Sequence, residues 1–417
     1  MITVRIKTHI IRFYVVLHVV EVFFIFFFLI NCSKSVKTTI YSDKPEFGLF
    51  ITTGSNEEMV FRSTDNIDKA ISYAKSIKVD TIFIHVYKDD ICYFDCDDRT
   101  GLNYKKASIQ GDCDLLKYLL KKAESSGIKC FAWFNCFGFY RTHHLIQKYG
   151  AQVLTRDQYG RYFNGRVKHE SNDRYYRRDK LFWLEPGDPR VQAYLLDLLS
   201  KLLERYPLIA GVQLDFIRYP ADPPFIPGSR YMRWGYSSGY GQASVNRFYR
   251  KFGFYPDEEN LGMEMNPGYS GAMKAFQWDS WRRNQITDFV VKSKKICRAY
   301  GKKLAASVFA FADRLYFHGF QDWRDWLKNK HVDFVILMNY SYNSELVYHI
   351  TKQHVSSYPR GVWVALGAYI MKKQPEKLKR QLIDMHKLRV PGIVLFEYFS
   401  INTAEKIVSV IQDYEIR

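Results

Sequence analysis

Several signatures that would classify this 417-residue chain at once are missing. It has neither a pair of CxxC motifs nor an HExxH motif, so a zinc site has little support and we expect no metal. No glycine-rich phosphate fingerprint follows the first predicted strand, which disfavours a doubly wound dinucleotide-binding sheet. The net charge is +18, yet Lys and Arg are scattered rather than grouped in a stripe, and no nucleic-acid module is recognisable. We therefore expect no cofactor and no nucleic-acid partner.

Aromatic residues, by contrast, are unusually frequent, at 17% with 31 Tyr and 31 Phe. A core uses few Tyr hydroxyls, so many of these side chains should lie on surfaces or in a cleft. The positive charge suits an acidic polymer or an anionic lipid, although a lysine-rich proteome would give the same balance.

The N-terminus has the features of an export signal. "MITVRIKTHIIR" is basic, and the apolar "VFFIFFFLI" that follows is too short to span a bilayer by itself. The run ends in "LINCSKS", which resembles a bacterial lipoprotein signal with Leu29 at −3 and Cys32 as the lipid-modified residue, although Asn31 departs from the usual small residue. We expect a signal at 1–31, a tether at 32–45 and one domain at 46–417. A plain signal anchor is the alternative; either would place the protein in the periplasm or on the cell surface, tied to a membrane.

Export makes disulfides possible for the six cysteines beyond Cys32. The spacing of Cys92 and Cys96 is compatible with a local bridge. For Cys130 and Cys136 we favour buried thiols.

Strand-like runs alternate with helix-like runs along the rest of the chain. The runs are rich in β-branched and aromatic residues and nearly continuous in hydrophobicity, as strands covered on both faces must be. They lie at 47–54, 80–88, 129–137, 210–219, 303–311, 332–341, 361–369 and 392–400. Segments between them have helical period and helix-terminal residues, such as Pro189 near a first turn and Pro207 just past an end. Eight such units predict a (β/α)8 TIM barrel, with an open doubly wound sheet as the alternative.

Two connections are longer than the rest. Residues 138–180 follow the third strand and 221–275 follow the fourth, so both leave the C-terminal ends of strands, where barrel enzymes place their active sites. Both mix Tyr, Trp and Arg with Gly, which suits stacking on flat, hydroxylated ligands. A solvated loop with aromatic residues by chance is the alternative.

The fourth strand, "GVQLDFIRYP", ends on a carboxylate. Gln213 and Asp215 share the parity that points into the barrel, so Asp215 should lie near the mouth, partly desolvated. Such a setting can raise a carboxyl pKa towards the value a general acid needs, or hold a nucleophile in place, and we expect Asp215 to serve in one of these two roles. The alternative is a structural ion pair with Arg218.

Other strand ends add polar groups to the same rim: His85, Asp89, Asp90, Trp133, Asn135, Asp313, Asn339, Tyr340, Glu397 and Tyr398. Glycoside hydrolysis needs two carboxylates across a cleft. We assign Asp215 as one and choose Glu397 as the other, with Asp313 and Asp89 as rivals.

Four segments resemble the bacterial glycosyl-hydrolase-like 10 family: "GVQLDFIRYP", "KCFAWFN", "FQWDSWRRNQITDFV" and "HVDFVILMNYS". The resemblance extends from about residue 46 to 400, and only the first motif is specific. It implies a barrel and an exported, often lipid-anchored enzyme that cleaves glycosidic bonds, with peptidoglycan glycan strands as one substrate class.

The resemblance also implies site residues: Asp215 as the motif acid, with Trp133, Asn135, Arg218, Tyr219 and Asn339 in the cleft. One departure is that better-known barrel glycosidases carry a glutamate at the seventh strand, and "GVWVALGAY" has none.

The leading hypothesis is therefore a membrane-anchored glycoside hydrolase acting on a cell-envelope or extracellular polysaccharide. Arg218 and Arg282 would bind acidic groups, and His85, Tyr340 and Tyr398 would complete the substrate-binding set. The alternative is a surface lipoprotein that holds saccharide on the same scaffold without cutting it. Oligomeric state is not predicted.

Overall fold

The computed structural model describes residues 44–53, 59–96, 113–165, 180–221, 237–261 and 269–414. The predicted signal and Cys32 lie outside these residues. Within them, none of the helices has both the length and the apolarity needed to cross a bilayer.

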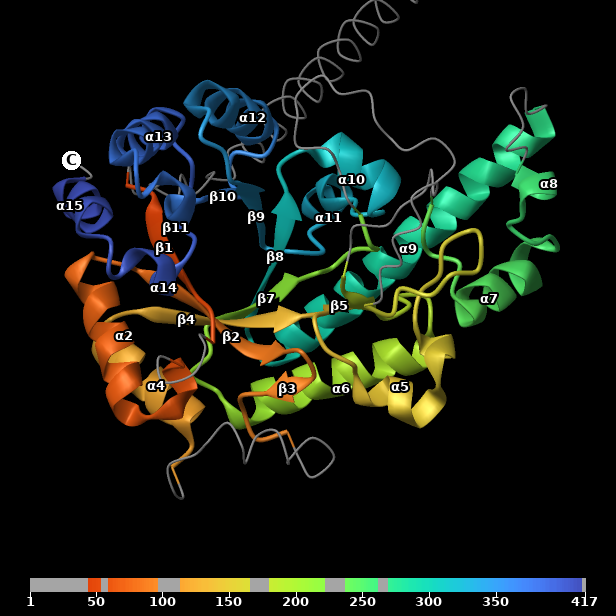
Figure 1. The fold of residues 1–417 in the computed structure, drawn as a ribbon, viewed down its shortest axis with the longest axis horizontal. Coiled ribbons are helices and arrows are strands. Elements are labelled where there is room, and N and C mark those ends of the chain that lie inside the picture. Colours follow the sequence, from red (N-terminus) through yellow and green to blue (C-terminus); the bar gives the residue numbers. More distant parts are fainter. Residues whose placement is uncertain are drawn as a thin grey trace, which may run out of the picture. The chain divides into compact units, whose positions relative to one another are not determined.

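Eight parallel strands close into a barrel, which confirms the predicted fold (Figure 1). In order around the barrel they are β1 (Glu46–Ile51), β2 (Thr81–Lys88), β4 (Lys129–Asn135), β7 (Gly211–Asp215), β8 (Lys303–Phe309), β9 (Phe334–Asn339), β10 (Val362–Leu366) and β11 (Gly392–Leu395). β11 returns to pair with β1, which leaves no open edge in the ring. A two-residue strand, β3 (Ile91–Cys92), forms a hairpin on the end of β2.

Helices follow the strands and cover the barrel (Figure 1). They include α2 (Thr64–Ser76), α4 (Leu115–Ser125), α6 (Pro189–Arg205), α9 (Tyr269–Ala299), α10 (Ala312–His318), α11 (Trp323–Lys328), α12 (Ser344–Ser357), α13 (Pro375–Lys387), α14 (Tyr398–Ile401) and α15 (Glu405–Asp413). Local sequence explains their starts. Asp188 caps α6 by accepting from the Arg190 amide, with Pro189 in the first turn as predicted.

The alternation of side chains along the strands produces two apolar layers. One fills the barrel and contains Phe50, Phe83, Phe131, Trp133, Ala305, Phe334, Ile336, Trp363, Ala365 and Val394. The other lies between strands and helices. Large rings in the barrel face small residues: a Cβ on Gly392 would lie 2.1 Å from Trp363 Cδ2. Burying each such ring contributes roughly 2–3 kcal/mol of transfer free energy. A strand shifted by one residue would move its rings to the other layer, so this energy strongly favours the observed register.

The two long connections have more regular structure than the predicted loops. The first contains β5 (Gly138–Phe139), α5 (His144–Tyr149) and β6 (Phe182–Trp183), with β5 and β6 paired antiparallel. The second contains α7 (Gln242–Phe252) and α8 (Glu258–Leu261) and leads into α9. An isolated bridge between Asp157 and Ser238 joins the two connections directly. They therefore lie against each other, as expected for segments leaving neighbouring strands.

The structure has Cys92 and Cys96 as buried thiols, so the local bridge suggested by their spacing is wrong. Cys130 and Cys136 are also buried thiols, and burial raises the pKa of both.

Candidate active site

Asp215 is the last residue of β7, and the chain turns sharply after it. Phe216 has a φ of +50°, a left-handed conformation that costs about 1–3 kcal/mol for a residue with a side chain. The turn aims the Phe216 amide at Asp215 Oδ1, to which it donates at 2.7 Å. The Phe216 ring packs 5.8 Å from the Trp183 ring and over Gly138, where a Cβ would lie 2.7 Å from Phe216 Cδ1. The β5–β6 ribbon therefore holds the turn that orients the carboxylate.

The second carboxylate oxygen of Asp215 is held from the neighbouring strand. Trp133 Nε1 donates to Asp215 Oδ2 at 3.0 Å, across the parallel pairing of β4 and β7. Burial raises the pKa of Asp215; the Phe216 amide, the Arg218 charge and the Trp133 hydrogen bond oppose that rise without cancelling it. The result is an oriented carboxyl that keeps its proton to a higher pH than an ordinary Asp.

Arg218 lies in an aromatic box beside this carboxyl. Its guanidinium carbon is 4.8 Å from the Trp183 ring centroid, 5.3 Å from Phe216 and 5.0 Å from Phe309. These contacts stabilise the cation while the side chain is almost fully buried. Its fixed charge lowers the pKa of Asp215.

His85, Trp133 and Asn135 form one wall of the mouth. The His85 ring stacks on Trp133 with a centroid distance of 3.4 Å, and His85 Nε2 lies 3.3 Å from Asn135 Oδ1. Burial, aided by the Lys88 charge, lowers the pKa of His85 well below its usual range, so the ring is neutral. An amide oxygen can only accept, so His85 donates to Asn135 through Nε2.

Tyr340 and Phe396 form a second wall. Their ring centroids lie 5.2 Å apart, and Phe396 also contacts Trp133 at 6.2 Å. Burial raises the pKa of Tyr340, and the charge of Asp215 adds to the effect. The structure thus brings together six of the predicted residues: His85, Trp133, Asn135, Asp215, Arg218 and Tyr340.

Glu397 is held at a different point of the rim. Its carboxylate accepts from Thr52 Oγ1 at 3.1 Å, from the Phe399 amide at 3.3 Å and from Ser400 Oγ, and thereby caps α14. Glu397 lies two residues beyond the end of β11, so strand parity does not assign its side chain to either face of the barrel. Among the described residues, no hydrogen bond joins Glu397 to the group around Asp215.

The two rival carboxylates are also held elsewhere. Asp89 accepts from the Tyr140 amide at 2.7 Å. Asp313 pairs with Arg324, and its side chain is 74% exposed.

Four other predicted residues are not brought to the mouth. Asn339 Nδ2 donates to Val347 O at 3.2 Å on α12, because Asn339 and Tyr340 are adjacent and cannot share a parity. Tyr398 packs on Tyr73 of α2, with ring centroids 5.4 Å apart.

Tyr219 and Arg282 support the long connections instead. The Tyr219 hydroxyl donates to Glu185 Oε1 at 2.7 Å. Arg282 donates to Ser237 Oγ and to the Ser238 carbonyl.

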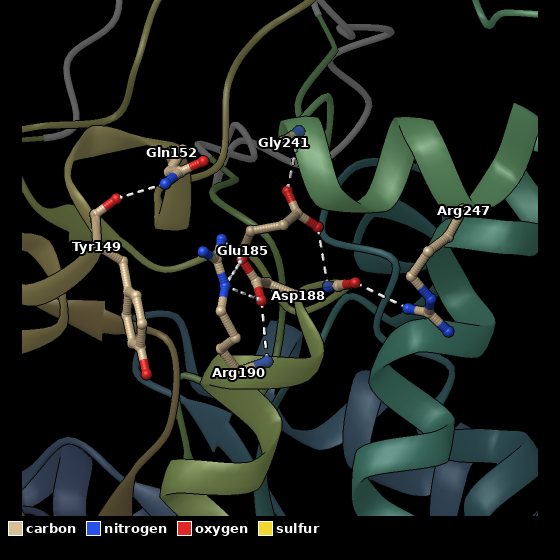
Figure 2. Close-up of polar contacts among 8 residues, drawn as sticks. Tyr149, Gln152, Glu185, Asp188, Arg190, Gly241 and Arg247 are labelled. Carbon is tan, nitrogen blue, oxygen red and sulfur yellow. Dashed lines mark hydrogen bonds and ion pairs between the residues drawn. The ribbon is translucent and has the colours of Figure 1, made fainter.

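Sequence reasoning missed Glu185, a fully buried acid in the first long connection (Figure 2). It accepts from Tyr219, from the Gly187 amide at 2.9 Å and from the Gly241 amide at 3.1 Å, where α7 begins. A Cβ on Gly241 would lie 2.4 Å from Glu185 Oε2. Burial raises the pKa of Glu185 to about 7 against these hydrogen bonds. The residue follows a two-residue strand, too short for any periodicity to reveal its place.

Asp90, His143 and His144 are spaced closely enough to share a metal ion, with ligand atoms within 4.8 Å of one another. Their hydrogen bonds favour a different role. His143 Nδ1 accepts from the Leu145 amide, so Nε2 carries the proton and donates to Tyr87 at 2.8 Å. His144 Nδ1 lies 2.9 Å from Asp90 Oδ1. The cluster fits a network that ties the β2–β3 hairpin to α5.

Comparison with known proteins shows similarity to glycosyl hydrolases. The family model "Glycosyl hydrolase-like 10" matches residues 47–358. The glycosyl hydrolase DigH of Escherichia coli K12 is 26% identical over 287 residues, which cover 62% of this chain and 54% of DigH. The DigH of Shigella flexneri matches equally. The chain therefore spans about half the length of the curated relatives it matches.

Solved structures agree on the fold. The PgaB (BpsB) glycoside hydrolase domain of Bordetella bronchiseptica superposes with a TM-score of 0.60 at 13% identity, covering 88% of this chain and 99% of that domain. The catalytic domain of β-amylase from Paenibacillus polymyxa gives 0.57 at 12% identity, covering 89% and 98%. Both share the barrel architecture.

Proposed function

The chain belongs to the glycosyl hydrolase-like 10 family, and on that premise we propose that it hydrolyses glycosidic bonds of a polysaccharide with Asp215 as the catalytic acid. The observation that carries the proposal is the carboxyl at the end of β7, half-buried and held through both oxygens. Its raised pKa suits a group that must still be protonated when the substrate arrives.

The chemistry needs one proton and one water molecule. Asp215 would protonate the glycosidic oxygen as the bond from that oxygen to the anomeric carbon breaks. Water would then attack the anomeric carbon and release its proton to a base, so that each turnover consumes one water and restores the proton count. Glu397 is our proposed base, although its hydrogen bonds to Thr52 and Ser400 also suit a helix cap.

The substrate we propose is a cell-envelope or extracellular polysaccharide, with peptidoglycan glycan strands as the first candidate. Aromatic walls made by Trp133, Tyr340 and Phe396 suit the faces of sugar rings. The overall charge of +18 favours a polymer that carries carboxylates.

We further propose that the chain is exported and anchored to a membrane through lipid on Cys32. The basic start, the apolar run and the "LINCSKS" segment support this location.

The test is an assay of new reducing ends on purified peptidoglycan glycans, intact and stripped of peptides. We expect Asp215→Asn to reduce the rate by about 10²–10⁴-fold, because the amide cannot donate the carboxylic proton. Asp313→Asn is the matched control, since that carboxylate is exposed and paired with Arg324. Glu397→Gln separates the two roles of that residue: a loss comparable with that of Asp215→Asn assigns the base, and near-normal activity leaves Glu397 as a cap.

A second function, saccharide binding without cleavage, is favoured by two observations. β10 ends at Leu366 and is followed by Gly367 rather than an acid, and no hydrogen bond among the described residues links Asp215 to a second carboxylate. Saccharide bound by the wild type with no reducing ends released, across these glycans and a wider panel, would contradict the hydrolase and support the binding protein.

A further inference from the structure

A groove lies at the C-terminal ends of β9 and β10, the same edge of the barrel that carries Asp215. It has a volume of about 490 Å³ and is lined by Tyr342, Tyr369, Ile370, Lys372, Lys373, Gln374 and Lys377. That volume is within the range of small-ligand pockets and can hold a sugar unit.

The groove and the mouth share a wall. The Tyr369 ring lies 6.1 Å from Tyr340 and 5.8 Å from Phe396, the two rings that form the second wall of the mouth. Gly367 makes this approach possible, since a Cβ there would lie 3.1 Å from Tyr340 Cβ and 3.3 Å from Tyr369 Cε1. A chain of sugars leaving the mouth past Tyr340 would therefore enter the groove.

The charge of the groove is of one sign. Three of its lining residues are lysines and none is acidic. The ion pairs found among the described residues include none of these lysines, whereas Arg380, on the same helix as Lys377, pairs with Asp384 and Glu345. Lys377 Nζ lies 5.7 Å from the Tyr342 ring centroid. The two tyrosine side chains are exposed, Tyr342 at 52% and Tyr369 at 38%, so a ligand can reach both rings.

We propose that this groove is a subsite for an acidic sugar, one that bears a carboxylate, in the polymer cleaved at Asp215. The inference rests on the proposed function for the position of the cleaved bond. The tyrosine rings stack on the sugar face, and the lysine ammonium groups bind the carboxylate as point charges.

The test measures binding in the Asp215→Asn background, so that no ligand is consumed. The ligands are hyaluronan and oligogalacturonate oligosaccharides, each compared with the same oligosaccharide after its carboxyls are reduced to alcohols. We expect Lys372→Gln/Lys373→Gln/Lys377→Gln to weaken binding of the acidic ligands at least about tenfold and to leave the reduced ligands unchanged. The same three substitutions should also reduce the salt dependence of the affinity for the acidic ligands.

The matched control is Lys69→Gln/Lys75→Gln/Lys121→Gln, which removes the same charge from exposed positions on α2 and α4. It should bind like the parent. A parent protein that prefers neither acidic ligand, a groove variant within about twofold of the parent, or an equal loss in the control variant would each overturn the subsite.

Failure of the subsite and failure of the hydrolase give different results. If the wild type cleaves an acidic polymer and the groove variant does so with unchanged kcat/KM, the subsite is wrong and the hydrolase stands. If nothing is cleaved but acidic binding depends on the three lysines, the subsite stands without the hydrolase.

Discussion

Raising the pH from about 4.5 to 8 will destabilise this fold through Glu185. The carboxyl is 0% exposed and accepts hydrogen bonds from three donors: the Gly187 amide before α6, the Tyr219 hydroxyl after β7 and the Gly241 amide at the start of α7. Its pKa is about 7 in the folded protein and 4.5 in an unfolded chain, so the folded state binds the proton more tightly. Stability from this proton is fully present below 4.5 and is lost as the pH rises through about 7, the reverse of a salt-bridged carboxylate.

The size of the effect follows from the two pKa values. A difference between 4.5 and about 7 corresponds to about 3 kcal/mol of unfolding free energy. Glu185→Gln keeps the shape and removes the titration. The variant carries a constant cost, because the amide group cannot accept from every donor that the carboxylate satisfies.

The assay is urea unfolding of both proteins at several pH values, followed by tryptophan fluorescence. The wild type should lose about 3 kcal/mol relative to Glu185→Gln between pH 4.5 and 8, with most of the loss between 5 and 7. Glu204→Gln, the same substitution at an exposed acid on α6, is the matched control. A Glu185→Gln difference that stays constant within about 0.5 kcal/mol would refute the reasoning and show that the carboxylate is stabilised as fully as in water.

Two further predictions concern the mouth and the N-terminus. Trp133→Phe removes the indole donor that favours the Asp215 anion, so the pKa of Asp215 should rise. In a plot of kcat/KM against pH, the side governed by Asp215 should therefore move to higher pH. If that side does not move, Trp133 does not control the pKa of the catalytic acid. Cys32→Ala should abolish incorporation of labelled fatty acid and release the protein from the membrane fraction, and a variant that is still labelled would exclude Cys32 as the lipid site.

The strands were predictable because barrel strands are covered on both faces and therefore form apolar runs bounded by polar ends. The position of Asp215 was predictable for the same reason. Side chains two residues apart on a strand face the same way, so Asp215 points into the barrel as Gln213 does, and its place at the end of the apolar run puts it at the mouth. The mutual approach of His85, Trp133 and Asn135 followed from the barrel, since neighbouring parallel strands end at one edge.

Near the ends of two strands, the sequence assigned residues to the mouth that the structure holds elsewhere. Asn339 and Tyr340 were both assigned to the mouth, yet adjacent side chains face opposite ways and only Tyr340 lies there. Beyond β7 the left-handed turn at Phe216 redirects the chain, so Tyr219 packs on Glu185 instead of lining the cleft.

The sequence by itself determined the barrel and the carboxyl at its mouth, because both follow from the periodic burial of single strands. Only the tertiary structure decided which polar groups meet that carboxyl, where Glu185 lies, and that three lysines join two tyrosines beside the mouth. Those arrangements bring together residues far apart in the chain, and they depend on how connections pack against one another, which no local period encodes.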